Sequence, residues 1–317
     1  MNIYRPLASL AFVSLGVAGL ARQPVGSPSG ARQGVSARKV LFTFGRELIF
    51  LDVATLRVDR LQVPGGQLPQ QAAASPDGQT IAYTATARSR GAQLYLWKLE
   101  EPTPRMVGEN SGYYADPRFS ADGRWIYFAH NREGMGRPTA HMGQAYAQLY
   151  RMRPDGTAFE ALSDEKGCHY SPAPAVNHVY FIHTLCHRSS RQIESLDLRT
   201  GKTRQLESFA NAEDLAVTDG AESMAWVIRS VETMRVLMRG RGKSRPIELF
   251  KLRKTSDAMQ LTWLDRDRLA FAYRHSIWTW SKTAGLRAVL DLKTTAPPQH
   301  ASEPESACTD CARAEAP

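Results

Sequence analysis

The chain has 317 residues, of which 43% are hydrophobic and 22% are charged, and its formal net charge is +9. These values fall within the range of folded globular proteins and exclude an intrinsically disordered polymer. Beyond the N-terminal region no segment approaches 18 uninterrupted apolar residues, so we expect a soluble mature chain without a transmembrane segment.

Residues 1–21 are predicted to be a secretory signal peptide. Arg5 precedes an apolar stretch at residues 7–20, and Gly19-Leu20-Ala21 forms a small-x-small cleavage site. An uncleaved N-terminal anchor is the alternative, while the lack of a cysteine after the apolar stretch disfavours a lipoprotein. Export predicts a periplasmic or secreted protein with no nucleic acid partner, and residues 22–38 are predicted to be a linker.

Short strands of alternating apolar residues recur along the chain. They begin at Ile81, Ile126, Val179, Met224 and Leu269, at intervals of 45, 53, 45 and 45 residues, and a sixth copy begins at Leu41. A period of about 40 to 50 residues with this alternation is typical of a β-propeller, in which each repeat forms one blade. The sequence therefore predicts an all-β, six-bladed propeller of four-stranded antiparallel blades at residues 39–295, with an insertion at 131–147 and a disordered tail at 296–317.

The other strands of the third repeat are predicted at residues 117–120, 148–152 and 158–162. The first repeat has no candidate for an innermost strand. Residues 291–295 follow the last predicted strand, and we expect them to supply the missing one, because a closed ring leaves no exposed sheet edge.

Two tetrapeptides precede the strands of the second and third repeats. Ser75-Pro76-Asp77-Gly78 and Ser120-Ala121-Asp122-Gly123 resemble the PD40 repeats of the TolB-like family, and Asp219-Gly220 is a weaker copy. In this motif the aspartate accepts backbone hydrogen bonds and the glycine reverses the chain. We therefore interpret these residues as structural turns.

The resemblance implies a periplasmic binding module with a TolB-like propeller. TolB itself resembles a propeller preceded by an α/β domain that acts in the Tol-Pal envelope system, and residues 22–38 offer no room for such a domain, so a Tol-Pal role does not follow. Prolyl-oligopeptidase-type enzymes carry a similar propeller beside a hydrolase domain, but the sequence contains neither G-x-S-x-G nor H-E-x-x-H. We predict no catalytic residue.

Histidines and tyrosines concentrate in the third and fourth repeats, where we expect them on loops of one propeller face. A partner-binding patch of imidazoles and aromatic rings suits a protein or cell-envelope ligand. The residues are His130, His141, His169, His183, His187, Tyr113, Tyr114, Tyr146 and Tyr170.

Two alternatives to the patch stay open. One is a metal-dependent hydrolase or lactonase that uses the same histidines with Asp116 or Glu133; because the spacing is not a metal signature, no metal or cofactor is predicted. The other is a structural scaffold that makes its contacts through the tail or a basic blade. We expect a monomer in either case.

Two further features concern cysteines and charge. Cys168 and Cys186 are predicted to form a disulfide across the mouth of the fourth repeat, and Cys308 and Cys311 a local one in the tail. The segment between residues 235 and 254 contains eight basic residues and a single acidic one, Glu248. We interpret this segment as a solvated blade edge, with an anionic partner as the alternative.

Overall fold

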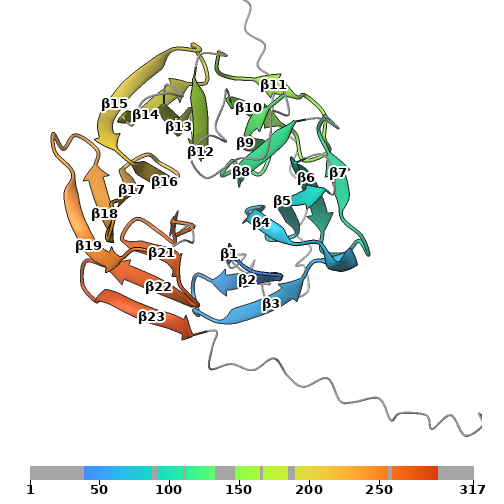
Figure 1. Cartoon of the computed structure of the whole chain (residues 1–317), viewed down its shortest axis with the longest axis horizontal. Coiled ribbons are helices and arrows are strands. Elements are labelled where there is room, and N and C mark those ends of the chain that lie inside the picture. Colours follow the sequence, from blue (N-terminus) through green and yellow to red (C-terminus); the bar gives the residue numbers. More distant parts are fainter. Residues whose placement is uncertain are drawn as a thin grey trace, which may run out of the picture. The chain divides into compact units, whose positions relative to one another are not determined.

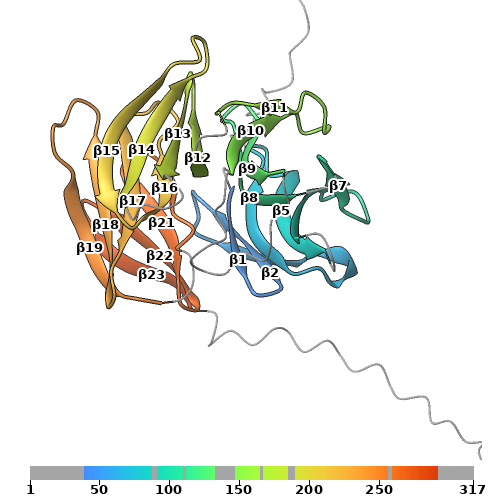
Figure 2. The same ribbon diagram turned by 45° about the horizontal axis from the view of Figure 1, so that its top comes forward.

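The computed structural model describes residues 39–87, 91–109, 112–132, 147–164, 167–184, 190–255 and 259–291. In this part of the chain, six antiparallel sheets surround a central axis (Figures 1 and 2), and the only helical element is a 3₁₀ turn at Pro64–Gly66. The predicted all-β, six-bladed propeller is confirmed. None of the described elements is a helix long and apolar enough to cross a membrane. The predicted signal peptide, linker and tail lie outside the described residues.

The strands follow one another from blade to blade in chain order. Blades 1 to 3 consist of β1 (Lys39–Phe44), β2 (Glu47–Asp52), β3 (Val58–Gln62); β4 (Pro69–Ala74), β5 (Thr80–Ala87), β6 (Gly91–Lys98), β7 (Arg105–Val107); and β8 (Tyr113–Phe119), β9 (Ile126–Asn131), β10 (Gln148–Met152), β11 (Glu160–Ala161). Blades 4 to 6 consist of β12 (Cys168–Ala175), β13 (His178–Thr184), β14 (Ser190–Asp197), β15 (Thr203–Ala210); β16 (Ala212–Val217), β17 (Ser223–Arg229), β18 (Thr233–Gly240), β19 (Ile247–Arg253); and β20 (Thr262–Trp263), β21 (Arg268–Tyr273), β22 (Ser276–Ser281), β23 (Gly285–Asp291).

The apolar core is divided among the junctions between blades. Each of the six clusters of buried side chains joins two successive blades, including the last and the first, where Phe42 packs with Ala270 and Ala272. A strand inside a blade contacts a neighbouring blade on each face, so both of its side-chain rows are buried. For this reason every residue of β9 is buried.

The turns before the second strands hold the tetrapeptides noted in the sequence. Asp77 Oδ1 accepts hydrogen bonds from Ser75 Oγ and Gln79 N, and Gly78 has a φ of 71°. Asp122 and Gly123 repeat this arrangement in blade 3.

The weaker copy in blade 5 is organised differently from our interpretation. Ala221 adopts the left-handed conformation, with a φ of 58°, and its N–H donates to the carbonyl of Thr218. Thr218 therefore stands where Ser75 stands in blade 2, and Gly220 takes the place of the aspartate rather than that of the glycine. Asp219 and Gly220 lie in this turn as interpreted, but its left-handed residue is Ala221, one position later than the glycine of the motif.

The ring closes through side chains at the junction of blades 6 and 1. Gln260 Oε1 accepts hydrogen bonds from Thr43 N at 2.7 Å and from Thr43 Oγ1 at 2.9 Å, while Gln260 Nε2 donates to the carbonyl of Thr43. The described part of blade 1 is a three-stranded sheet, as the sequence suggested. Asp291 ends β23 opposite Ser276, and residues 292–295, predicted to complete blade 1, lie outside the described residues.

Candidate functional site

The histidines and tyrosines predicted on loops of blades 3 and 4 lie in strands where they are described. Tyr113 and Tyr114 belong to β8, His130 to β9, His169 and Tyr170 to β12, and His183 to β13. Except for Tyr113 and His183, these residues are buried. The loop assignment was wrong because the second strands run past their apolar start: β9 pairs with β8 and β10 as far as His130.

In blade 3 the rings form a sealed aromatic layer. Tyr114 stacks on His130 with ring centroids 4.1 Å apart, and the edge of His130 faces Tyr150 and Phe159. Tyr114 Oη also accepts a hydrogen bond from the backbone N–H of Glu109 at 2.7 Å. Burial raises the pKa of the Tyr114 hydroxyl. This layer fills the end of the blade with side chains that solvent does not reach.

In blade 4 the same strand positions carry two histidines. His169 and His183 stack almost in parallel, with centroids 4.7 Å apart. His183 Nδ1 lies 2.9 Å from Glu194 Oε1, and His169 Nδ1 lies 3.1 Å from the carbonyl of Ala147 and 3.2 Å from Ser163 Oγ. Because a carboxylate or a carbonyl oxygen can only accept, Nδ1 of both rings carries a proton.

Burial distinguishes the two members of this histidine pair. His169 is 3% exposed, whereas the side chains of His183 and Glu194 are 18% and 11% exposed. Burial, and next the neighbouring His183, hold the pKa of His169 below the 6.5 of an ordinary histidine. His169 is therefore an internal group, whereas His183 is the partly exposed member of the pair.

The remaining predicted site residues are not brought together in the described structure. His141, Tyr146, His187 and Glu133 lie outside the described residues, as do Cys186, Cys308 and Cys311. Cys168 is fully buried at the start of β12, and the predicted Cys168–Cys186 bond stays a prediction. Within the described ranges, no three His, Cys, Asp or Glu side chains are placed so that they could hold a metal ion.

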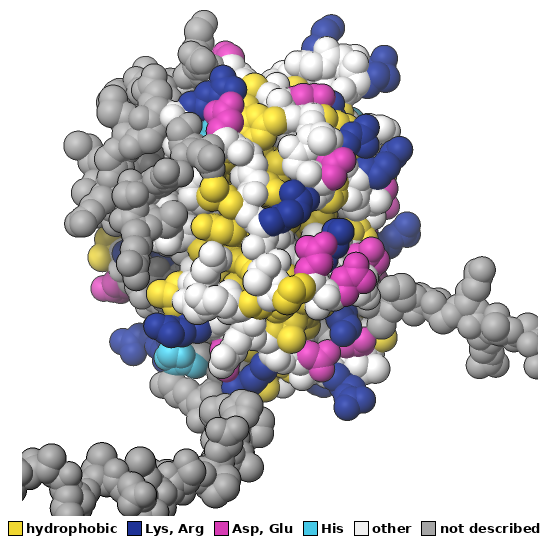
Figure 3. Space-filling model, turned by 90° about the vertical axis from the view of Figure 1, so that its right-hand side faces the viewer, with side chains coloured by type: hydrophobic (Ala, Val, Ile, Leu, Met, Phe, Trp, Pro, Cys, Tyr) yellow, Lys and Arg dark blue, Asp and Glu magenta, His cyan; other side chains and the backbone are white. Residues whose placement is uncertain are grey.

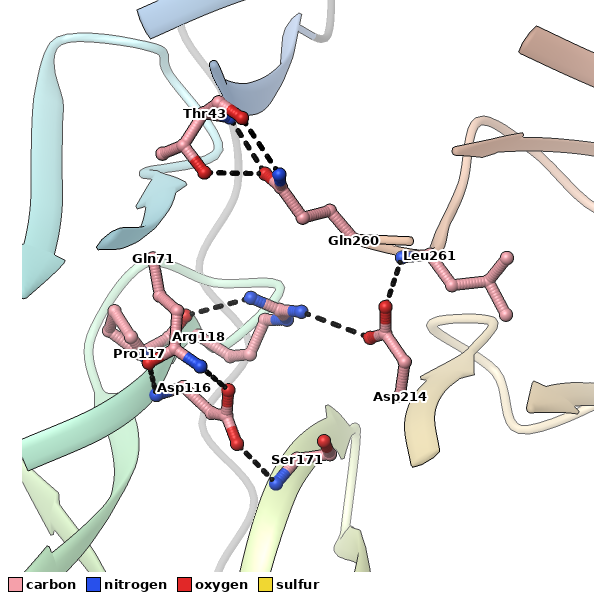
Figure 4. A network of polar contacts seen from close by, with 9 residues as sticks. All are labelled: Thr43, Gln71, Asp116, Pro117, Arg118, Ser171, Asp214, Gln260 and Leu261. Carbon is pink, nitrogen blue, oxygen red and sulfur yellow. Dashed lines mark hydrogen bonds and ion pairs between the residues drawn. The ribbon is translucent and has the colours of Figure 1, made fainter. Parts of the chain in front are cut away.

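A second polar arrangement surrounds the propeller axis (Figure 4). The first strands of blades 3 to 5 shift register at Asp116, Ser171 and Asp214, which have φ values near 50°, and the first strand of blade 2 shifts register just before Gln71. Such bulges redirect a side chain from the sheet. Here they turn side chains toward the axis, where each can meet the next blade.

The axial side chains bridge successive blades. Asp116 Oδ1 accepts from Gln71 Nε2, and Asp116 Oδ2 accepts from the backbone N–H of Ser171 at 2.9 Å. Asp214 Oδ2 in turn accepts from the N–H of Leu261 at 3.0 Å. Both carboxylate oxygens of Asp116 are thus engaged by protein groups, so Asp116 serves as an inter-blade bridge in this structure.

Asp214 differs electrostatically from Asp116. Its side chain is 11% exposed, and burial raises its pKa to about 6 even though Arg118 Nη2 lies 3.8 Å from Oδ1. The ion pair therefore offsets only part of the desolvation of the carboxylate.

The sequence interpretation named Asp116 only as a possible metal-site carboxylate, and it missed the bridging role of the axial residues and the polar partners in blade 4. Gln71, Asp116, Ser171, Asp214 and Gln260 are polar residues at matching places in successive first strands, and alignment of the repeats on those strands could have identified them. Ser163 and Glu194 had no such signal, because their contacts depend on how three strands pack.

No protein-family model matches the sequence of this chain. An uncharacterized protein of Agrobacterium fabrum is 28% identical over 150 residues, a match that covers 47% of this chain and 45% of that protein. The match thus spans less than half the length of the curated relative.

Solved structures of similar fold include two TolB proteins and an oligogalacturonate lyase. A putative TolB from Agrobacterium tumefaciens is 16% identical with a TM-score of 0.55 over 68% of this chain and 78% of that chain. TolB from Acinetobacter baumannii is 18% identical with a TM-score of 0.57 over 79% and 62%. An oligogalacturonate lyase in complex with manganese is 16% identical with a TM-score of 0.53 over 74% and 70%.

The fold and the comparisons together define the class of this protein. It is a six-bladed β-propeller whose blade junctions are apolar and whose axis is bridged by polar side chains. Its fold is that of the TolB-like propellers. At these identities the similarity concerns the fold alone.

Proposed function

We propose that this chain is an exported TolB-like propeller that binds a protein or cell-envelope ligand and does not turn it over. Its ligand face is the mouth of blades 3 and 4, the end of the blades where the second strand connects to the third. The mouth includes His183, Glu194 and Tyr113.

The observation that carries this proposal is the His183–Glu194 pair, in which the side chain of His183 is partly exposed. In blade 3 the position opposite the buried phenylalanine is Tyr150, whereas in blade 4 it is Glu194. Packing alone does not require an ionisable pair there, since rings fill the same space in blade 3. A carboxylate hydrogen-bonded to an imidazole at a mouth can bind polar groups of a partner.

The connections at this mouth support the same proposal. Residues 132–147 join β9 to β10 and residues 185–189 join β13 to β14, whereas residues 45–46 and 274–275 suffice in blades 1 and 6. Longer connections on a rigid scaffold are a common place for binding residues.

The test compares ligand capture by three forms of the full chain. The immobilised protein is exposed to a cell-envelope extract as wild type, as His183→Gln/Glu194→Gln, and as the control Arg274→Gln/His275→Gln at the equivalent connection of blade 6. A ligand retained by wild type and control but lost by the mouth variant supports the proposal. Equal retention by all three forms would place the ligand elsewhere and refute this face.

The second candidate is a metal-dependent hydrolase or lactonase, which the likeness to a lyase solved with manganese keeps in view. The purified chain and the variant His130→Ala/His169→Ala/His183→Ala are compared by elemental analysis. Stoichiometric metal in the wild type that disappears in the variant would favour the enzyme over the binding module. We expect no such metal, because the described histidines are held by rings, carbonyls and a carboxylate of the protein itself.

A further inference from the structure

A groove lies between blades 4 and 5 at the opposite end of the strands from the mouth. Its walls include the turns that join first to second and third to fourth strands, with Asn177 and Lys202 in blade 4 and Ala221 and Lys243 in blade 5. In antiparallel blades these turns lie at one end and the connections of the mouth at the other. The groove has a volume of about 1020 Å³, so it has room for several units of a polymer.

The charged side chains that line the groove are mostly basic. They include Lys202 and Arg204 from blade 4 and Arg241 and Lys243 from blade 5, all of them exposed, together with the less exposed Arg239. Arg239 forms an ion pair with Glu207. No ion pair joins the other four to any carboxylate of the described residues.

Two carboxylates lie in or near the groove. Asp197 is the one acidic residue of the lining, and it accepts hydrogen bonds from the backbone N–H groups of Arg199 and Thr200. These bonds hold its pKa below the usual value. Glu222 accepts from Thr218 Oγ1 and faces Arg266. The groove thus carries five basic side chains in its lining, with Asp197 in the lining and Glu222 near Arg241 as the acidic groups, so positive charge is in excess.

Other parts of the surface show the opposite arrangement. On the side of the molecule in Figure 3, basic and acidic side chains are intermixed. In blades 2 and 3, for example, Lys98 pairs with Glu101 at 3.0 Å and Arg151 with Glu160 at 2.7 Å. The excess of positive charge in the groove is thus a local feature of blades 4 and 5 and not a consequence of net charge alone.

The uncharged part of the lining indicates the kind of anion. Hydroxyl and amide groups of Ser195, Thr203 and Asn177 alternate with the rings of His178 and Tyr180. Such groups can bind the hydroxyls and ring faces of sugars, while guanidinium and ammonium groups bind carboxylates. The lining also includes the apolar side chains of Val176, Leu206 and Met224.

We propose that the groove between blades 4 and 5 binds an acidic oligosaccharide. Its carboxylates contact Arg204 on one wall and Arg241 and Lys243 on the other, and its hydroxyls contact the polar side chains between them. This site lies on a different surface from the mouth of blades 3 and 4, so it stands or fails independently of the proposed function.

The experiment titrates the full chain with a hexameric uronic-acid oligosaccharide by calorimetry at low salt. The groove variant is Arg204→Gln/Arg241→Gln/Lys243→Gln, and the charge-matched control is Lys251→Gln/Arg253→Gln/Lys254→Gln, on the exposed outer strand of blade 5 and just beyond it. We expect the groove variant to bind about tenfold more weakly than wild type, and the control to bind within about twofold of it. Equal weakening by both variants would reduce the effect to overall charge and overturn the site.

Three further titrations sharpen the result. A neutral hexasaccharide should give no measurable binding, and a hexaglutamate peptide should bind more weakly than the uronic-acid oligomer. If the peptide binds as tightly, the groove is a peptide site and the proposal is wrong. The mouth variant His183→Gln/Glu194→Gln should bind the uronic-acid oligomer as the wild type does, which separates the two surfaces.

Discussion

In blade 3 the stacked rings at the ends of the first two strands are those of Tyr114 and His130, whereas in blade 4 they are those of His169 and His183. The two pairs occupy equivalent positions, because each lies directly opposite in the register of its first and second strands. Both blades thus contain a stacked pair of rings, but the phenol of Tyr114 in blade 3 is replaced by the imidazole of His169 in blade 4.

The residue six positions before the first-strand ring also differs between the two blades, and the difference matches the size of that ring. In blade 3 this residue is Gly108, and a Cβ built there would lie 2.5 Å from Tyr114 Oη. In blade 4 it is Ser163, whose hydroxyl contacts the smaller ring of His169. The space that the tyrosine hydroxyl occupies in blade 3 is therefore occupied by the serine side chain in blade 4.

The two blades therefore share the total side-chain volume of this layer but not the chemical groups that fill it. A close-packed interior requires that the summed side chains fill the layer. Blade 3 fills it with one imidazole and the rings of tyrosine and phenylalanine, and blade 4 with two imidazoles, a carboxylate and a serine hydroxyl. Stability should therefore depend more on the rings in blade 3, and pH dependence should arise in blade 4.

Removal of each first-strand ring should separate the two blades most clearly. Tyr114→Ala is expected to lower the free energy of unfolding by about 3–5 kcal/mol, because it empties a buried ring site. His169→Ala is expected to cost less, about 1–3 kcal/mol, because the ring is smaller and its burial already carries a desolvation cost. Urea-unfolding midpoints, with the slope checked for constancy, measure both changes.

The control for this pair is Val231→Ala. Val231 is 88% exposed, so its truncation should leave the midpoint unchanged. Equal losses for Tyr114→Ala and His169→Ala would contradict the difference between the blades.

Conversion of blade 4 to the residues of blade 3 is the second test. His169→Tyr alone should destabilise the protein, since the added hydroxyl would meet the side chain of Ser163. His169→Tyr/Ser163→Gly should recover stability, with a coupling of about 0.5–3 kcal/mol between the two changes in a double-mutant cycle. If the two effects simply add, residues 163 and 169 do not depend on each other, and steric complementarity between them does not explain why blade 4 differs from blade 3.

The same double variant tests the origin of the pH dependence. His169 has a lowered pKa in the folded chain, so the unfolded chain binds the proton first as the pH falls below 6.5. Stability contributed by the neutral ring is thus present above pH 6.5 and is lost as the pH falls toward the lower, folded-state value. The double variant should lose less stability between pH 7 and pH 5 than the wild type, measured by the same urea midpoints. An unchanged pH profile would assign the effect to other groups.

The fold could be predicted because its signals are local and repeated. The apolar start of each second strand and the turn ahead of it recur at a nearly fixed interval, and each forms where predicted, for instance at Ile81 and Ile126. The shift at Asp219 and Gly220 arose because Thr218 replaces serine in the turn, which a search for Asp-Gly overlooks.

The candidate site could not be predicted to the same degree, because it depends on strand ends and packing between strands. His130 and His183 follow short apolar segments, so the pattern alone places them on loops, while hydrogen bonding to strands on both sides extends β9 and β13 through them. Likewise, Asp116 was considered as a metal-site carboxylate, but a bulge in β8 turns it toward Gln71 and Ser171.

The smallest expected effect concerns the serine that distinguishes blade 4. Ser163 Oγ accepts a hydrogen bond from the backbone N–H of Leu149 at 2.9 Å and lies beside His169 Nδ1. Ser163→Ala should lower the free energy of unfolding by about 1 kcal/mol, because it leaves the buried N–H without this acceptor. Ser281→Ala removes a comparable hydrogen bond from an exposed turn and should cost less than about 0.5 kcal/mol. If Ser163→Ala lowers the free energy of unfolding no more than Ser281→Ala does, the hydroxyl of Ser163 only fills space. Blade 4 would then differ from blade 3 only in the sizes of the side chains that fill the layer.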